Sequence, residues 1–160
     1  MSTTSTAPDT TIAFIGGGNM ASAIIGGLLH QGLGASRIEI VEPWAEARTR
    51  LHDQFGITAQ EAPGAALARC ALVVWAVKPQ TFRDAAAQAR AHTQHALHLS
   101  VAAGIRSDSI AQWLGSERIV RAMPNTPALV GKGMTGLFAR AAVSAQERSL
   151  VEAVVATTGE

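Results

Sequence analysis

Short apolar runs alternate with longer, alanine-rich stretches along most of this chain. The apolar runs, such as the segment ALVVWAV at 71–77, are continuous rather than alternating, which is typical of strands buried on both faces. Strands are expected at residues 11–15, 38–41, 71–77, 96–101, 118–123 and 133–139, with a weaker one around Ile57. The alternation predicts a mainly parallel sheet covered by helices, an α/β fold of the doubly wound type.

The stretches between these runs are predicted to be helical. They cover residues 20–31, 45–55, a short alanine-rich segment before 71, 80–91, 107–114 and a last helix after 144. Ser107 is expected to cap the helix that Gly115 closes. Ser144 and Glu147 have the spacing of a capping box, which marks the start of the last helix.

Composition and charge narrow the class of protein. The 160 residues suit one globular domain, since 48% are hydrophobic and 16% are charged. A net charge of +1 predicts neither nucleic-acid binding nor attraction to an acidic membrane surface. The single cysteine, Cys70, is expected to be a small buried hydrophobe, which is compatible with a reducing compartment such as the cytoplasm.

The two ends of the chain differ from its middle. Residues 1–10 are polar and have neither the basic nor the apolar part of a secretory signal, so we expect a flexible leader followed by a domain over 11–160. The apolar runs are far shorter than the ~20 residues that cross a bilayer, and no membrane association is expected.

A glycine-rich turn follows the first predicted strand. Gly16, Gly18 and Ala21 fit the pattern G-x-G-x-x-[GA], which predicts dinucleotide binding when it joins a strand to a helix. Gly16 allows the tight turn, Gly18 lacks the Cβ that would block the pyrophosphate, and Ala21 lets the helix approach the strand. The pyrophosphate would meet free N–H groups at the positive end of the helix dipole.

An acidic residue stands where such folds bind the adenosine ribose. Glu42 ends the second predicted strand, 24 residues after Gly18, and can accept hydrogen bonds from ribose hydroxyls. A carboxylate there would repel the 2′-phosphate of NADPH, unless Arg48 or Arg50 compensates. We therefore predict only modest discrimination between NADPH and NADH.

Four segments of the chain carry a family likeness. They are similar to the signature blocks of pyrroline-5-carboxylate reductase, in the same order, and the resemblance extends from Thr11 to Glu160. The segments are 14–21 (FIGGGNMA), 76–80 (AVKPQ), 100–105 (SVAAGI) and 121–127 (RAMPNTP). The resemblance implies a Rossmann-type domain of an oxidoreductase that reduces 1-pyrroline-5-carboxylate to L-proline, the last step of proline biosynthesis, with NADPH or NADH.

The resemblance also implies where the cofactor is bound. The implied contacts are Ile15, Gly16, Gly17, Gly18, Asn19, Met20, Glu42, Ala76, Val77, Lys78, Pro79, Val101, Ala102 and Ala103. All of these lie at or just after the carboxyl ends of predicted strands, where open α/β sheets bind ligands. The family often has an asparagine before the helix that precedes the strand at 71–77; this chain has Gln60-Glu61-Ala62-Pro63, and no contact is assigned there.

Two further residues are candidates for orienting the substrate or the nicotinamide. Lys78 ends the central strand before a proline, and the alternative is a strand-end lysine that reaches into water. Asn125 stands in the rigid segment Pro124-Asn125-Thr126-Pro127, where the alternative is a turn-stabilising role. We assign no general acid, because an iminium carbon is already electrophilic and the protein's task is to hold the two reactants together.

Three histidines recur at every third position. His92, His95 and His98 would suggest a metal, but they span the end of a helix and the start of a strand and cannot all face one point. A solvated helix end is the preferred interpretation, and no metal is predicted.

Two other functions stay open from the residues alone. One is a non-catalytic dinucleotide-binding module that regulates a partner, and the other is the cofactor domain of a β-hydroxyacid or ketol-acid type dehydrogenase. The family's chain continues into a helical domain that forms a homodimer and much of the imine pocket. We therefore expect these 160 residues to be a fragment that binds the cofactor but is nearly inactive alone.

Overall fold

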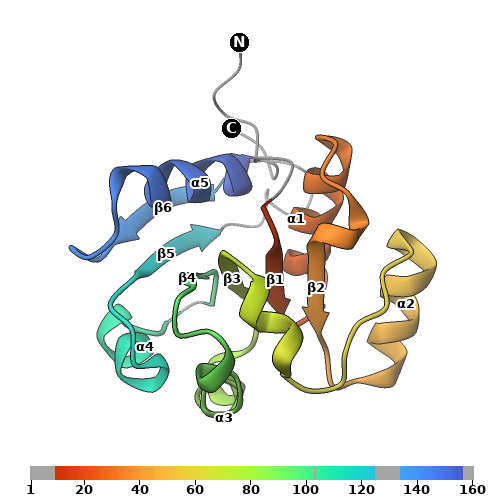
Figure 1. The fold of residues 1–160 in the computed structure, drawn as a ribbon, viewed down its shortest axis with the longest axis horizontal. Helices are drawn as coiled ribbons and strands as arrows, with labels where there is room; N and C mark the ends of the chain where they lie inside the picture. The colour runs from red at the N-terminus through yellow and green to blue at the C-terminus, as the bar shows by residue number, and fades with distance from the viewer. Residues whose placement is uncertain (1–9, 103, 125–133, 157–160) are drawn as a thin grey trace.

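The computed structural model describes residues 10–102, 104–124 and 134–156. Within them, six strands form one sheet in the order β2-β1-β3-β4-β5-β6, with helices against both faces (Figure 1). The strands are β1 (Ile12–Ile15), β2 (Ile38–Val41), β3 (Leu72–Trp75), β4 (Leu97–Ser100), β5 (Ile119–Pro124) and β6 (Met134–Ala139). The α-helices are α1 (Asn19–His30), α2 (Ala45–Phe55), α3 (Pro79–Ala89), α4 (Ser107–Leu114) and α5 (Ala145–Val155). Short 3-10 helices are η1 (Ala35–Arg37), η2 (Ala65–Arg69) and η3 (Arg90–His92).

The strand pairing confirms the doubly wound, mainly parallel sheet. β1 pairs in parallel with both β2 and β3, so Ile15 lies between Val41 on one side and Trp75 on the other. β4 and β5 continue the parallel order, and β6 returns antiparallel to β5. Because parallel strands share a direction, the carboxyl ends of β1 to β5 meet at one edge of the sheet.

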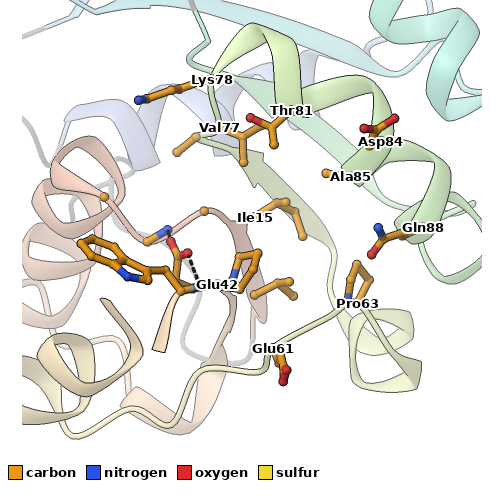
Figure 2. A pocket seen from close by; sticks show the side chains of 17 residues that line it. Ile15, Glu42, Glu61, Pro63, Val77, Lys78, Thr81, Asp84, Ala85 and Gln88 are labelled. Atoms are coloured by element: carbon orange, nitrogen blue, oxygen red, sulfur yellow. Dashed lines mark hydrogen bonds between the residues drawn. The ribbon is translucent and has the colours of Figure 1, made fainter. Parts of the chain in front are cut away.

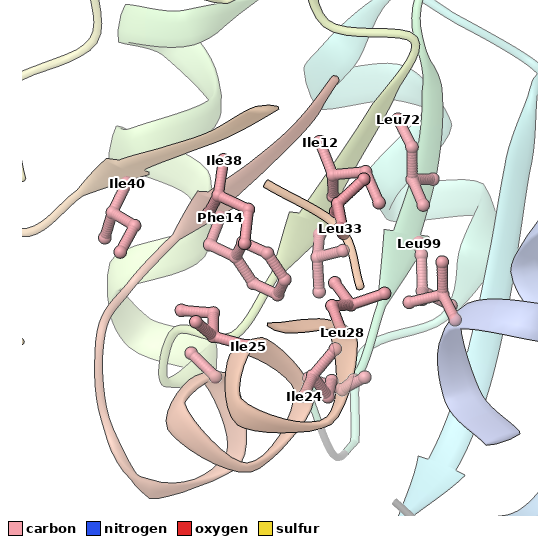
Figure 3. Packing of buried hydrophobic residues seen from close by; sticks show 14 of the residues in the cluster. Ile12, Phe14, Ile24, Ile25, Leu28, Leu33, Ile38, Ile40, Leu72 and Leu99 are labelled. Atoms are coloured by element: carbon pink, nitrogen blue, oxygen red, sulfur yellow. The ribbon is translucent and has the colours of Figure 1, made fainter. Parts of the chain in front are cut away.

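Alternate strand residues divide the core into two layers. Phe14 and its neighbours at every second position pack under α1, α2 and α5, and the intervening residues pack under α3 and α4. Figure 3 shows the first layer, in which Ile24, Ile25 and Leu28 of α1 lie against the strands. Burial on both faces explains why β1 and β3 are continuously apolar.

The last helix is part of this core. Val151 and Val154 are fully buried in the core layer that contains Phe14 and α1, and Leu150 and Val155 pack against that layer. The capping box is confirmed, since the Ser144 hydroxyl accepts from the Glu147 N–H and the Glu147 carboxylate accepts from the Ser144 N–H. Among the helices of the described residues, none combines the length and the apolar character that crossing a membrane requires.

Two local predictions were wrong. The N-cap of α4 is Arg106, and Ser107 is the first helical residue, whose hydroxyl instead accepts from the Arg140 guanidinium. The segment around Ile57 is not a strand, because only one isolated bridge, between Val41 and Gln60, ties it to the sheet edge. The expected leader lies outside the described residues apart from Thr10.

Candidate functional site

The glycine turn between β1 and α1 is held close to β3. The Gly16 N–H donates to the Val41 carbonyl over 2.8 Å, and Gly16 has a φ of +99°, in the region that favours glycine. A Cβ on Gly16 would lie 2.4 Å from the Ala76 carbonyl oxygen. This position therefore requires glycine for both its backbone angle and its packing.

Gly18 has a different role in the turn. It is the N-cap of α1 with an ordinary φ of −81°, and a Cβ added there would meet nothing within 4 Å. The protein itself therefore does not require glycine at this position. No side chain caps α1 and its first turn contains no acidic residue, so the positive end of the helix dipole is left for an anion.

Glu42 is tied to the glycine turn by main-chain hydrogen bonds. Its Oε1 accepts from the Gly17 N–H over 2.8 Å, and its Oε2 accepts from the Trp44 N–H over 3.0 Å. Nη1 of Arg48 donates to the main-chain carbonyls of Glu42 and Pro43, over 2.9 and 2.7 Å. These bonds fix the segment after β2 against the segment after β1.

A cavity of about 480 Å³ opens at the carboxyl ends of β1, β2 and β3 (Figure 2). One wall is the glycine turn, a second is the segment that follows β2, and a third is the start of α3. Its lining is Ile15, Gly16, Gly17, Gly18, Val41, Glu42, Pro43, Trp44, Glu61, Pro63, Ala76, Val77, Lys78, Thr81, Asp84, Ala85 and Gln88. It lies where open α/β sheets bind their ligands.

The cavity contains eight of the residues implied by the resemblance. They are Ile15, Gly16, Gly17, Gly18, Glu42, Ala76, Val77 and Lys78. Asn19, Met20 and Pro79 flank the cavity in sequence without lining it, and Val101 and Ala102 are buried at the end of β4. Ala103 and Asn125 lie outside the described residues. Lys78 is the N-cap of α3 and is exposed.

Sequence reasoning missed one wall of the cavity. Thr81, Ala85 and Gln88 recur at the spacing of one helical face, and Figure 2 shows them along the side of α3 that borders the cavity. Pro63, in the segment to which no contact was assigned, lies opposite Gln88 in the same view. The i, i+4, i+7 spacing in α3 was a readable signal, but it became informative only once the orientation of α3 was known.

A buried aromatic cluster lies beneath the α3 wall. The rings of Trp75 and Phe82 stack with their centroids 4.7 Å apart, and Phe82 also contacts Trp113 at 5.8 Å. The indole N–H of Trp75 donates to Nδ1 of His98 over 3.0 Å. Burial lowers the pKa of His98 from 6.5 to about 4, with a smaller opposing effect from the Thr93 backbone.

His98 also corrects an expectation about the three histidines. His98 is fully buried in β4, so the solvated helix end is the wrong interpretation for this residue, whereas His95 is exposed. In the residues that the structure describes, no three His, Cys, Asp or Glu side chains gather closely enough to hold a metal ion. Cys70 is fully buried as predicted, and that burial raises the pKa of its thiol to about 11.

Comparisons with known proteins identify relatives of this chain in sequence and in fold. A pyrroline-5-carboxylate reductase of Pseudomonas aeruginosa is 46% identical over 138 residues, which cover 85% of this chain and 50% of that protein. The structure of the Coxiella burnetii pyrroline-5-carboxylate reductase matches with a TM-score of 0.86 and 31% identity, covering 94% of this chain and 57% of the other. The Plasmodium falciparum enzyme, solved with NADP bound, matches in fold with a TM-score of 0.80 and 21% identity, over 95% of this chain and 56% of the other.

These comparisons confirm the resemblance read from the sequence. The chain spans about half the length of the curated relatives it matches. A family model described as NADP oxidoreductase coenzyme F420-dependent matches residues 11–104, which is more than half of the 160 residues. The chain therefore belongs to this oxidoreductase family, and its curated relatives are pyrroline-5-carboxylate reductases.

Proposed function

We propose that this chain is the cofactor-binding domain, residues 11–160, of a pyrroline-5-carboxylate reductase. The whole protein would transfer a hydride from NADPH or NADH to the cyclic imine 1-pyrroline-5-carboxylate and release L-proline. The observation that carries the proposal is the cavity beside Gly18, at an uncapped helix N-terminus and next to Glu42. Its place at the carboxyl ends of the strands suits a dinucleotide.

Each wall of the cavity suits one part of a dinucleotide. The pyrophosphate would lie over Gly18, where a side chain is missing and the first N–H groups of α1 point outward. Glu42 offers carboxylate oxygens to the adenosine ribose. Ala76, Val77 and Lys78 would border the nicotinamide half, and we keep Lys78 and Asn125 as candidates for orienting the nicotinamide or the substrate.

The bound cofactor supplies the hydride, and the residues of this chain supply position. Gly16 packs against the Ala76 carbonyl, so the pyrophosphate turn and the wall that follows β3 are held in a fixed relation. A fixed relation between two bound reactants lowers the entropic part of the barrier, which is the main requirement for reducing an electrophilic iminium carbon. We assign no general acid to this chain.

The setting of the whole protein is also part of the proposal. We propose that it is a homodimer or a larger homo-oligomer that acts in the cytoplasm on a small-molecule substrate, without nucleic-acid or membrane partners. The near-neutral charge and the single buried cysteine support this setting.

Replacement of Gly18 by valine tests the cofactor site. Because a Cβ at Gly18 meets no protein atom, Gly18→Val should leave the domain folded while abolishing binding of NADPH and NADH. Gly34→Val is a matched control, since Gly34 is exposed at the N-cap of η1 and outside the cavity. Calorimetric titration with both cofactors should show loss for Gly18→Val only, and unchanged affinity in Gly18→Val would remove the assignment.

Turnover tests the rest of the proposal. The protein that carries this chain should oxidise NADPH or NADH when 1-pyrroline-5-carboxylate is added, and the product should be L-proline. Residues 1–160 alone should bind a dinucleotide and turn over little, because the positional advantage requires both reactants to be held. Full turnover by residues 1–160 would mean that the substrate site lies within them.

A further inference from the structure

The segment after β2 points to a preference for the unphosphorylated cofactor. We propose that Glu42 makes NADH, rather than NADPH, the preferred dinucleotide of this chain, an inference that rests on the proposed function. The modest discrimination expected from the sequence then has a direction, and the structure supplies the reason for it in the contacts of Glu42, Arg48 and Arg50.

The Glu42 carboxylate cannot easily turn away from the ribose position. Both of its oxygens accept main-chain hydrogen bonds, from Gly17 at 2.8 Å and from Trp44 at 3.0 Å. Hydrogen bonds to an ionised acceptor are about twice as strong as neutral ones, so a rotation that breaks both is costly. The carboxylate therefore stays at the edge of the cavity, where it borders Gly17 and Pro43.

The phosphorylated and unphosphorylated riboses differ in what they offer to this carboxylate. A ribose 2′-hydroxyl is a donor, and an ionised carboxylate accepts through lone pairs that remain on both oxygens. A 2′-phosphate carries between one and two negative charges at neutral pH and presents acceptor oxygens. The same fixed group that binds NADH by a hydrogen bond therefore repels NADPH.

The nearby arginines do not offset that repulsion. Nη1 of Arg48 is engaged by the carbonyls of Glu42 and Pro43, and Arg48 is outside the lining of the cavity. Arg50 lines a separate groove with Asn19 and Gln54 and is outside the lining of the cavity. A phosphate-binding arginine fork is the usual device for selecting NADPH, and neither side chain is arranged as one.

The remaining charges of the cavity point in the same direction. Glu61 and Asp84 add two further carboxylates to its lining, against one cation, Lys78. Lys78 is the N-cap of α3 and belongs to the wall that follows β3, whereas Glu42 belongs to the wall that follows β2. Asp84 lies on α3 with Lys78. The acidic side of the cavity is therefore the one that holds Glu42 and Glu61, and its field disfavours an additional phosphate.

Equilibrium titration of residues 1–160 with NADH and NADPH tests the proposal. The dissociation constant should be at least about tenfold lower for NADH, which corresponds to ~1.4 kcal/mol. The ratio of the two constants should shrink as ionic strength rises from about 0.01 M to about 1 M, because salt screens repulsion between exposed charges. A tighter complex with NADPH, or a ratio that grows with salt, would overturn the proposal while leaving the dinucleotide site intact.

Variants locate the effect on Glu42. Glu42→Gln keeps an oxygen for the Gly17 N–H, and it should lower the NADPH-to-NADH ratio of dissociation constants roughly tenfold, mainly through tighter NADPH binding. Asp53→Asn is the matched control, since it removes one exposed carboxylate that lies outside the lining of the cavity and should change the ratio less than about twofold. An unchanged ratio in Glu42→Gln would contradict the role of Glu42. Binding of neither cofactor by the parent would instead overturn the proposed function itself.

Discussion

Mild acid should destabilise this domain through one buried histidine. His98 is fully buried, and its Nδ1 accepts from the Trp75 indole N–H, so its remaining proton is on Nε2. Within the described residues, Nε2 has no hydrogen-bond partner of acceptable geometry. A second proton would have to occupy Nδ1, where it would face the indole N–H and break the hydrogen bond to Trp75.

The shifted pKa gives the size and the sign of the effect. Burial lowers the pKa of His98 from 6.5 to about 4, so between these values the unfolded chain binds a proton that the folded chain does not. The free energy of unfolding is therefore highest above pH 6.5 and falls as the pH drops toward 4. The full loss is roughly 3 kcal/mol, a large part of the 5–15 kcal/mol typical of a domain.

Urea unfolding at pH values between about 4 and about 7 measures this loss, because the pH range brackets the two pKa values. His98→Leu removes the titrating group but leaves the Trp75 N–H without an acceptor, which costs about 1–3 kcal/mol at every pH. The double variant His98→Leu with Trp75→Phe removes both hydrogen-bonding partners, so no indole N–H is left unpaired at any pH. Both variants should show a shallower dependence of stability on pH than the parent.

Comparison with the variants separates His98 from other titrating groups. The pKa of the Asp108 carboxyl is lowered by its hydrogen bond to Arg140, and such carboxylates also lose stabilising contacts in acid. They titrate equally in the parent and in the variants, so the difference in slope belongs to His98. His52→Gln, at an exposed site on α2, is the control for replacing a histidine that is not buried. Equal slopes in the parent and in His98→Leu would refute the reasoning.

Two predictions concern stability at neutral pH. Gly16→Ala should lower the free energy of unfolding by more than about 2 kcal/mol in urea, because its Cβ would overlap the Ala76 carbonyl and because Gly16 has a φ of +99°. Gly18→Ala is the control and should change stability little. Ser144→Ala should lower the free energy of unfolding by about 1 kcal/mol, since it removes the acceptor of the Glu147 N–H at the start of α5. Ala145→Ser, at the next and exposed position, is the control. Equal urea midpoints for Ser144→Ala and the parent would contradict the capping role.

The fold could be predicted largely from hydrophobic patterning. Apolar runs predicted β1 to β5, because strands in a parallel sheet are covered on both faces, and β1 and β3 are apolar throughout. The strand at Ile57 was wrongly predicted, since Ile57 and Ala59 are buried by packing rather than by strand pairing. The predicted cap of α4 was wrong because of a contact distant in sequence. The Ser107 hydroxyl accepts a hydrogen bond from Arg140, more than 30 residues away.

The site was predictable where one sequence segment forms one wall. The turn at Gly16–Gly18, the acid Glu42 and residues 76–78 after β3 were predicted from the sequence as cofactor contacts, and they line the cavity. The contribution of α3 and Pro63 to the cavity depends on how α3 packs across the sheet. A local sequence pattern does not predict that packing. The buried partner of Trp75 was also beyond reach, because polarity alone placed His98 in solvent and its acceptor role depends on β3 and β4 being neighbours.

Glu42 shows how one residue can carry both structure and selectivity. The pattern of strand, glycine turn and acid predicted a ribose contact, but it gave no reason for the turn to keep its shape. The Gly17 N–H donates to Glu42, and the Gly16 N–H donates to the Val41 carbonyl one residue before it, so the end of β2 holds two successive amides of the turn. A change at Glu42 made to admit a 2′-phosphate therefore also loosens the turn that binds the pyrophosphate. Cofactor preference and affinity are coupled at this residue, which is why Glu42→Gln, with its retained acceptor, is a sharper probe than a shorter side chain.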